Sequence, residues 1–191
     1  MINELESVND KQIVLSNDIT LKDMFSHLVL NILPFEEANI VLADTAEKIL
    51  DLCEIDLPDD ERAKDAFQAI KEYNEGKLLP HELYFRRNGV AYAAEDYHDE
   101  TGKDSRPLLA ITALATSITL YNSNIKNGYD NEKAIESAKS PMKVTIDHLF
   151  KIINTEGNEA YKLTVGKHII NLGIEKKLPS VNKFLENGNN E

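Results

Sequence analysis

The chain has 191 residues, of which 42% are hydrophobic and 28% charged, and its formal net charge is −12. This length and composition suit one folded domain with a sizeable core and exclude wholesale disorder. The strong negative charge argues against nucleic acid and anionic membranes as partners, because both are bound through Lys and Arg. We expect a single domain over residues 1–187, with 188–191 as a frayed tail.

The acidic residues gather in the first half of the chain. Residues 1–100 carry 23 acidic and 9 basic side chains, whereas residues 101–191 carry 10 and 12. A field of one sign speeds the encounter with an oppositely charged protein. The N-terminus lacks the pattern of a signal peptide, no run approaches the ~20 apolar residues that cross a bilayer, and the single Cys53 lies in an apolar run. We therefore expect a cytoplasmic protein.

Helical periodicity recurs along the first half, whereas strand signals are nearly absent. Thr20 and Asp23 have the spacing of a capping box, and Pro34 ends the helix that they start. Gly76 suits the residue after a helix that opens at 58–62. The other helices predicted in this half cover residues 35–53 and about 80–98.

The second half opens with the most hydrophobic helix, which Ser105 caps and which we expect at the centre of the fold. Asp130 and Ser140-Pro141 are predicted to begin two separate helices, over 131–139 and 141–154. Two more are predicted over 158–172, stopped by Gly173, and over 180–186. These patterns predict an all-α, single-domain bundle of about eight or nine helices.

One dipeptide allows an enzymatic interpretation. His98-Asp99 resembles the His-Asp pair of the HD-domain phosphohydrolases, which are all-helical metalloenzymes. The resemblance implies a divalent metal that activates water, held by His81, His98, Asp99 and Asp147. The alternative is a polar helix end that enters a solvated loop. The pair Arg86-Arg87 is predicted to bind nearby acids rather than a phosphate.

A second pattern covers residues 55–125. It comprises Leu57-Pro58-Asp59-Asp60-Glu61-Arg62, the turn Gly76-Lys77, the pair Arg86-Arg87 and Ala-rich stretches at 91–94 and 108–121. The pattern resembles the alanine-rich, all-helical immunity proteins of bacterial polymorphic toxin systems. The resemblance implies a non-enzymatic inhibitor without a cofactor, which protects its own cell by binding a cognate toxin.

We expect that partner to be basic and to meet acidic side chains around an aromatic anchor. The candidate contact residues are eight acids, together with two tyrosines if these are exposed: Asp56, Asp59, Asp60, Glu61, Asp65, Tyr92, Glu95, Asp96, Tyr97 and Asp99. Two alternatives stay open, namely the HD-type metal-dependent phosphohydrolase and an oligomeric helical scaffold or regulator.

Overall fold

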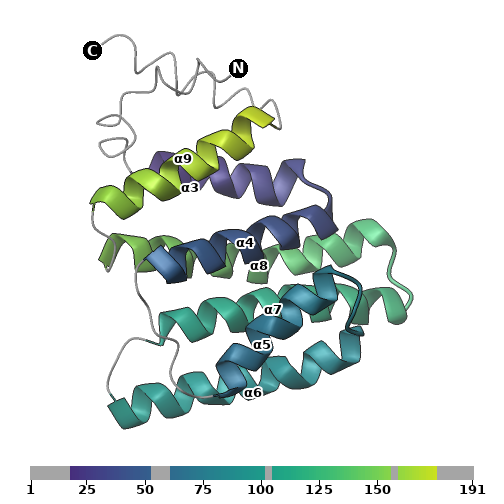
Figure 1. Ribbon diagram of the computed structural model, residues 1–191. Helices are drawn as coiled ribbons and strands as arrows, with labels where there is room; N and C mark the ends of the chain where they lie inside the picture. Colours follow the sequence, from purple (N-terminus) through teal and green to yellow (C-terminus); the bar gives the residue numbers. More distant parts are fainter. Residues whose placement is uncertain (1–17, 53–60, 102–104, 156–158, 176–191) are drawn as a thin grey trace.

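The computed structural model describes residues 18–52, 61–101, 105–155 and 159–175 (Figure 1). These ranges contain seven α-helices and no strand, so the all-α class is confirmed, while the predicted number of helices is slightly high. In chain order the helices are α3 (Asp18–His27), α4 (Phe35–Leu52), α5 (Glu61–Asn74), α6 (Pro80–Thr101), α7 (Arg106–Lys126), α8 (Asn131–Thr155) and α9 (Glu159–Glu175). The helix predicted over 180–186 and the tail over 188–191 lie outside the described residues.

The helices stack in layers (Figure 1). At the top of this view lie α3 and α9, followed by α4 and α8, then α7 with α5 across it, and α6 forms the bottom. The most extensive packing joins α7 to α8 and to α6, so α7 is the central helix, as its composition predicts. This stacking leaves the lower side of α6 without a covering helix among the described residues.

Burial explains why α7 occupies the centre. Leu108, Leu114 and Ile118 are at most 1% exposed, and Ser105 stands at the N-cap, although its side chain makes no capping hydrogen bond. Leu109 and Ile125 are two apolar residues of this helix that are instead exposed. In length and composition α7 could cross a membrane, but buried core helices of soluble proteins have the same length and composition.

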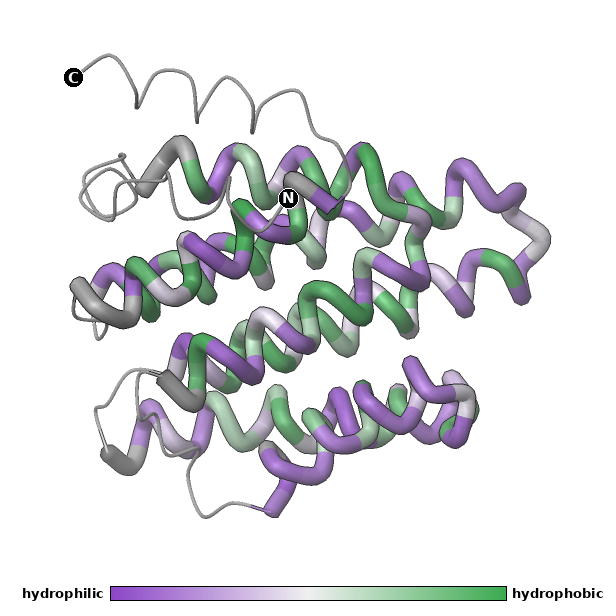
Figure 2. The backbone as a smooth tube through the Cα atoms, turned by 45° about the horizontal axis from the view of Figure 1, so that its top comes forward, coloured by the Kyte–Doolittle hydropathy of each residue, from purple (hydrophilic) through white to green (hydrophobic). Residues whose placement is uncertain are grey.

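The buried residues of α4 recur every three or four positions. In α4, Ala38, Leu42, Ala46 and Ile49 are buried, while Cys53 lies outside the described residues. Hydrophobic and hydrophilic residues accordingly alternate at the spacing of helical turns along the tube of Figure 2. After α5, Gly76 has a φ of +73°, a left-handed conformation that suits glycine, as predicted for this turn.

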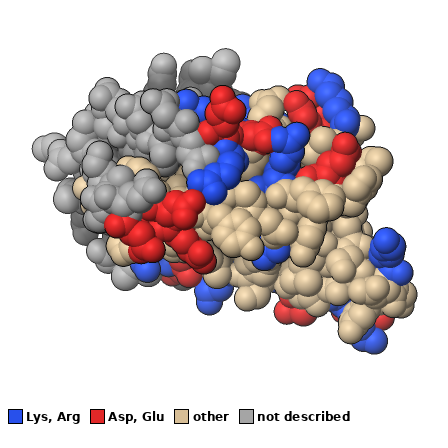
Figure 3. All heavy atoms as spheres, turned by 90° about the horizontal axis from the view of Figure 1, so that it is seen from below, with Lys and Arg blue, Asp and Glu red and all other residues tan. Residues whose placement is uncertain are grey.

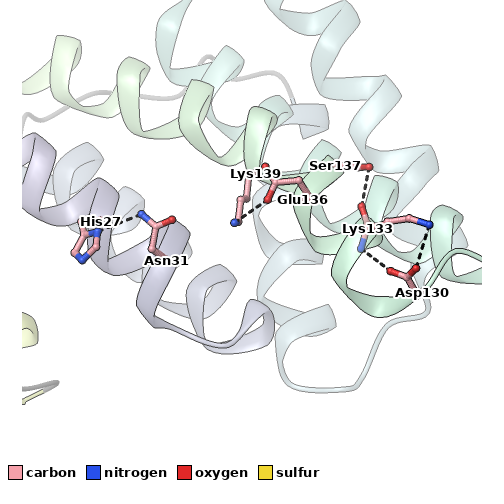
Figure 4. A network of polar contacts seen from close by, with 7 residues as sticks. All are labelled: His27, Asn31, Asp130, Lys133, Glu136, Ser137 and Lys139. Atoms are coloured by element: carbon pink, nitrogen blue, oxygen red, sulfur yellow. Dashed lines mark hydrogen bonds and ion pairs between the residues drawn. The ribbon is translucent and has the colours of Figure 1, made fainter.

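The first described helix widens near its end. α3 continues directly into a π-helical segment, η1 (Leu28–Ile32), in which the Leu33 N–H donates to the Leu28 carbonyl at 3.0 Å. Asn31 Nδ2 lies 3.2 Å from His27 Nδ1 on the outer side of this turn (Figure 4). The helical run ends before Pro34 as predicted, but Thr20 lies inside α3 and not at its cap.

The predicted break at Ser140-Pro141 is wrong, because α8 is one helix of 25 residues with Pro141 inside it. The predicted cap of this helix is confirmed: Asp130 Oδ1 accepts the Lys133 N–H at 2.8 Å, and the Lys133 ammonium lies 3.4 Å from Asp130 Oδ2 (Figure 4). The hydrogen bond from the Lys133 backbone, above all, lowers the pKa of Asp130.

The predicted stop at Gly173 is also wrong, since α9 continues to Glu175. A glycine costs a helix only about 1 kcal/mol relative to alanine, which packing can offset. In α9 this packing comes from Val165, Ile169 and Ile170, which are buried.

Candidate functional site

The candidate contact residues that the structure describes lie on two adjacent helices, α5 and α6. They are Glu61 and Asp65 at the start of α5, and Tyr92, Glu95, Asp96, Tyr97 and Asp99 in the last part of α6. Asp56, Asp59 and Asp60 lie outside the described residues. Five described acids belong to this candidate surface: Glu61 and Asp65 from α5, and Glu95, Asp96 and Asp99 from α6. We call all five together the acidic end of α6.

Two ion pairs hold the start of α5 beside α6. Arg62 Nη2 lies 2.9 Å from Asp96 Oδ2, and Arg86 forms an ion pair with Asp65. Both pairs are well exposed, so each contributes little to stability. Seen from below in Figure 3, acidic side chains gather toward the left of the face, beside a broad area without charged residues.

The remaining three acids, Glu61, Glu95 and Asp99, are exposed and have no ion-pair partner among the described residues. Their carboxylates face water. They are therefore the members of the acidic end that are open to a cationic partner, whereas Asp65 and Asp96 already neutralise an arginine each.

The two tyrosines differ in exposure. Tyr92 is 62% exposed and meets the condition set for an aromatic anchor. Tyr97 is half-buried and packs against the hydrophobic core, so its ring is not available as an anchor. The aromatic part of the candidate surface is therefore Tyr92.

A hollow of about 370 Å³ lies between the last part of α6 and the first part of α7. Its apolar walls come from Ala91, Ala94 and Leu109, and the carboxylates of Glu95 and Asp99 belong to its lining. Leu109 comes from α7, where it is exposed. Its helical neighbours Thr112 and Thr116 form a polar face, and this spacing could have shown that Leu109 points away from the core.

The structure does not assemble the metal site implied by the HD resemblance. His98 and Asp99 line the hollow, but His81 lies 17 residues earlier on the same helix, roughly 25 Å away along its axis. Asp147 lies on α8, where its carboxylate is 2.6 Å from Lys22 Nζ. Among the described residues, no three His, Cys, Asp or Glu side chains are grouped so that they could hold a metal ion. The described residues therefore do not bring the four side chains of this set together.

The arginine pair behaves as predicted at one position only. Arg86 pairs with Asp65, but Arg87 Nε donates to Thr116 Oγ1 at 2.9 Å and Arg87 Nη1 donates to Asn88 Oδ1 at 3.1 Å. The Arg87 guanidinium also lies 5.8 Å from the centre of the Tyr84 ring. The described residues that Arg87 contacts are thus neutral.

No family model, curated protein or solved structure matches the chain. What the site can do therefore follows from its own residues. An exposed aromatic ring on the same helix as a hollow with apolar walls and acidic groups suits a cationic protein surface better than a small anion.

Proposed function

We propose that the protein is a non-enzymatic binding protein that holds a basic protein partner at the acidic end of α6. The observation that carries this proposal is the position of exposed Tyr92 on the same helix as the hollow lined by Glu95 and Asp99. Exposed tyrosines at the centre of a protein interface supply much of its binding energy.

The hollow fits a Lys or Arg side chain of the partner. Its aliphatic stem would pack against Ala91, Ala94 and Leu109, while its charged head would reach the carboxylates of Glu95 and Asp99. A charge-assisted hydrogen bond of this kind is stronger than a neutral one. The ring of Tyr92 offers a second contact, since cations also bind over aromatic faces.

The charge of the whole first half supports the same partner. Residues 1–100 have 14 more acidic than basic side chains, so a basic protein would be attracted before it makes contact. The resemblance to immunity proteins of polymorphic toxin systems makes a cognate toxin, encoded beside this gene, our proposed partner. Binding would block that toxin within the producing cell.

Titration calorimetry with the product of the neighbouring gene tests the proposal. We expect a stable one-to-one complex, weakened about tenfold or more by Tyr92→Ala, as for an anchor residue. Replacing Glu95 and Asp99 with Gln and Asn should mainly slow association and reduce its salt dependence.

Matched control variants separate this site from a general charge effect. Tyr129→Ala removes a tyrosine that is 52% exposed but lies outside the site, and Glu132 and Glu136 are exposed acids on α8. Replacing these control residues should leave the affinity almost unchanged. The proposal would be overturned by the absence of a complex, or by equal losses in Tyr92→Ala and Tyr129→Ala.

A further inference from the structure

A second, larger hollow lies at the opposite end of α6. It has a volume of about 540 Å³ and lies between the beginning of α6 and the end of α7. Its lining includes two aromatic rings and several hydrogen-bonding groups: His81, Tyr84, Phe85, Asn122, Ser123 and Lys126. Of its lining residues, only His81 belongs to a site considered above, the HD-type metal set.

The aromatic wall of the hollow is unusually open to solvent. Phe85 is 69% exposed, more than any other large hydrophobic residue that the structure describes. The Tyr84 and Phe85 rings meet edge to face, with their centres 6.1 Å apart, and Arg87 lies over the Tyr84 ring. An exposed Phe beside a concave surface is typical of a ligand site, because a ligand would bury it.

The polar part of the hollow favours an anion. Its lining contains Lys126 and His81 but no carboxylate, and Lys126 has no ion-pair partner among the described residues. Ser123 and Lys126 are three positions apart on α7, so they share one face of that helix. In a chain with a net charge of −12, a hollow with this lining stands out as a locally basic site.

The hydrogen bonds at the end of α7 do not occupy the Lys126 side chain. The N–H groups of Asn127, Gly128 and Tyr129 donate to the carbonyls of Ser123, Ile125 and Asn124, each at 3.0 Å. The last carbonyls of the helix therefore have hydrogen-bond donors already and do not depend on the Lys126 ammonium. The Lys126 side chain remains available to a ligand.

We infer that this hollow binds a small aromatic anion, that is, a flat apolar ring with one carboxylate, sulfonate or phosphate group. The ring packs against Phe85 and Tyr84. The anionic group accepts hydrogen bonds from Lys126 Nζ, the Ser123 hydroxyl and a His81 ring N–H. This site lies at the other end of α6 from the acidic end. A test of this inference therefore does not depend on the proposed function.

Two fluorescent probes of similar ring structure test the inference. The anionic probe is 8-anilinonaphthalene-1-sulfonate, and its neutral counterpart is N-phenyl-1-naphthylamine. We expect one anionic probe to bind per chain, with an affinity about tenfold lower in Lys126→Gln, the loss typical of one charge-assisted hydrogen bond. The affinity for the neutral probe should not change in Lys126→Gln, whereas Phe85→Ala should lower the affinity for both probes.

Controls distinguish this site from nonspecific binding. Lys143→Gln removes an exposed lysine on α8 and should leave the affinity for the anionic probe unchanged. Near-UV circular dichroism of each variant should match that of the parent protein, since partly unfolded chains also bind this dye. Equal anionic-probe affinities in Lys126→Gln and the parent protein, or binding of several probes per chain, would overturn the inference.

Discussion

His168 is a partly buried residue through which pH acts on this fold. Burial, with Lys48 adding to it and Asp44 opposing it, lowers the pKa of His168 below its ordinary value of 6.5. Its Nε2 lies 3.3 Å from Thr45 Oγ1, which joins α9 to α4. Because its pKa is higher in the unfolded chain than in the folded one, protonation below 6.5 favours unfolding.

We therefore predict that the contribution of His168 to stability is complete above pH 6.5 and decreases as the pH falls below this value. His168→Gln should make the unfolding free energy less dependent on pH in this range. The side chain is half-exposed, so after solvent screening the effect should be less than about 1 kcal/mol. Urea unfolding at several pH values measures this effect, with His81→Gln as an exposed control. If the unfolding free energy changed equally with pH in His168→Gln and in the parent protein, the prediction would be contradicted.

A buried polar pair links α4 to α7. Asn39 is 1% exposed and Ser117 is fully buried; Asn39 Nδ2 donates to the Phe35 carbonyl at 2.8 Å, and the Ser117 hydroxyl lies 3.1 Å from Asn39 Oδ1. Buried polar groups that lose their partners cost about 1–3 kcal/mol.

We predict that Asn39→Ala lowers the unfolding free energy by about 1–3 kcal/mol. Ser117→Ala should cost less, and the double variant should cost less than the sum of the two, because each change removes the same interaction. Asn171→Ala, which alters an exposed asparagine on α9, is the matched control. Strict additivity in a thermal or urea unfolding cycle would show that the pair is not coupled.

At the scale of elements, Pro141 is the clearest conflict between local preference and the observed helix. Proline has no N–H, so the Ser137 carbonyl loses its usual backbone donor four residues later, and the ring crowds the preceding turn. Pro141→Ala should restore the hydrogen bond and raise the unfolding free energy by roughly 1–3 kcal/mol. Ser140→Ala, at the exposed neighbouring position, should change it far less. A destabilised Pro141→Ala variant would show instead that α7 requires the present course of α8.

The elements that the sequence predicts well are those whose ends have a local cause. Pro34, Gly76 and Asp130 act through their own backbone or side chain, and the structure confirms all three. At Pro141 and Gly173 the local cost is outweighed by packing against other helices, which no window of sequence contains. Helix ends set by tertiary contacts were therefore missed.

The candidate site shows the same division. The acids of α6 could be chosen as candidate contact residues because charge is visible in the sequence. The exposure of Tyr92 agrees with Glu95 and Asp96, its polar neighbours one turn along the helix. The burial of Tyr97 and the participation of Leu109 depend on how α6 lies against other helices. The same holds for the HD-type metal set, because the sequence does not show that His81 and His98 are far apart on one helix or that Asp147 pairs with Lys22.

At the scale of the whole molecule, α6 presents two chemically different ends. One end carries the open carboxylates of Glu95 and Asp99, and the other a hollow with Lys126 and exposed Phe85. Both hollows lie between α6 and α7, whose central position fixes them relative to the core. The layered stack thus places the two proposed binding surfaces on one packed pair of helices.

Net charge also governs the stability of the molecule. Seven ion pairs join described residues, and in each pair both side chains are at least 32% exposed, so their contribution is small. The repulsion that results from a net charge of −12 is spread over the whole fold and is weaker in the expanded unfolded chain. Repulsion should therefore outweigh the ion pairs.

We predict that sodium chloride stabilises the protein. Raising its concentration from about 20 mM to about 500 mM shortens the screening length from about 20 Å to about 4 Å, which suppresses long-range repulsion. The Tm from calorimetry should rise by a few degrees. A variant with Glu61→Lys and Asp99→Lys, four units less negative, should show a smaller rise because less repulsion remains to be screened. A fall in Tm with salt would mean that the ion pairs of α5, α6 and α8 contribute more than their exposure indicates.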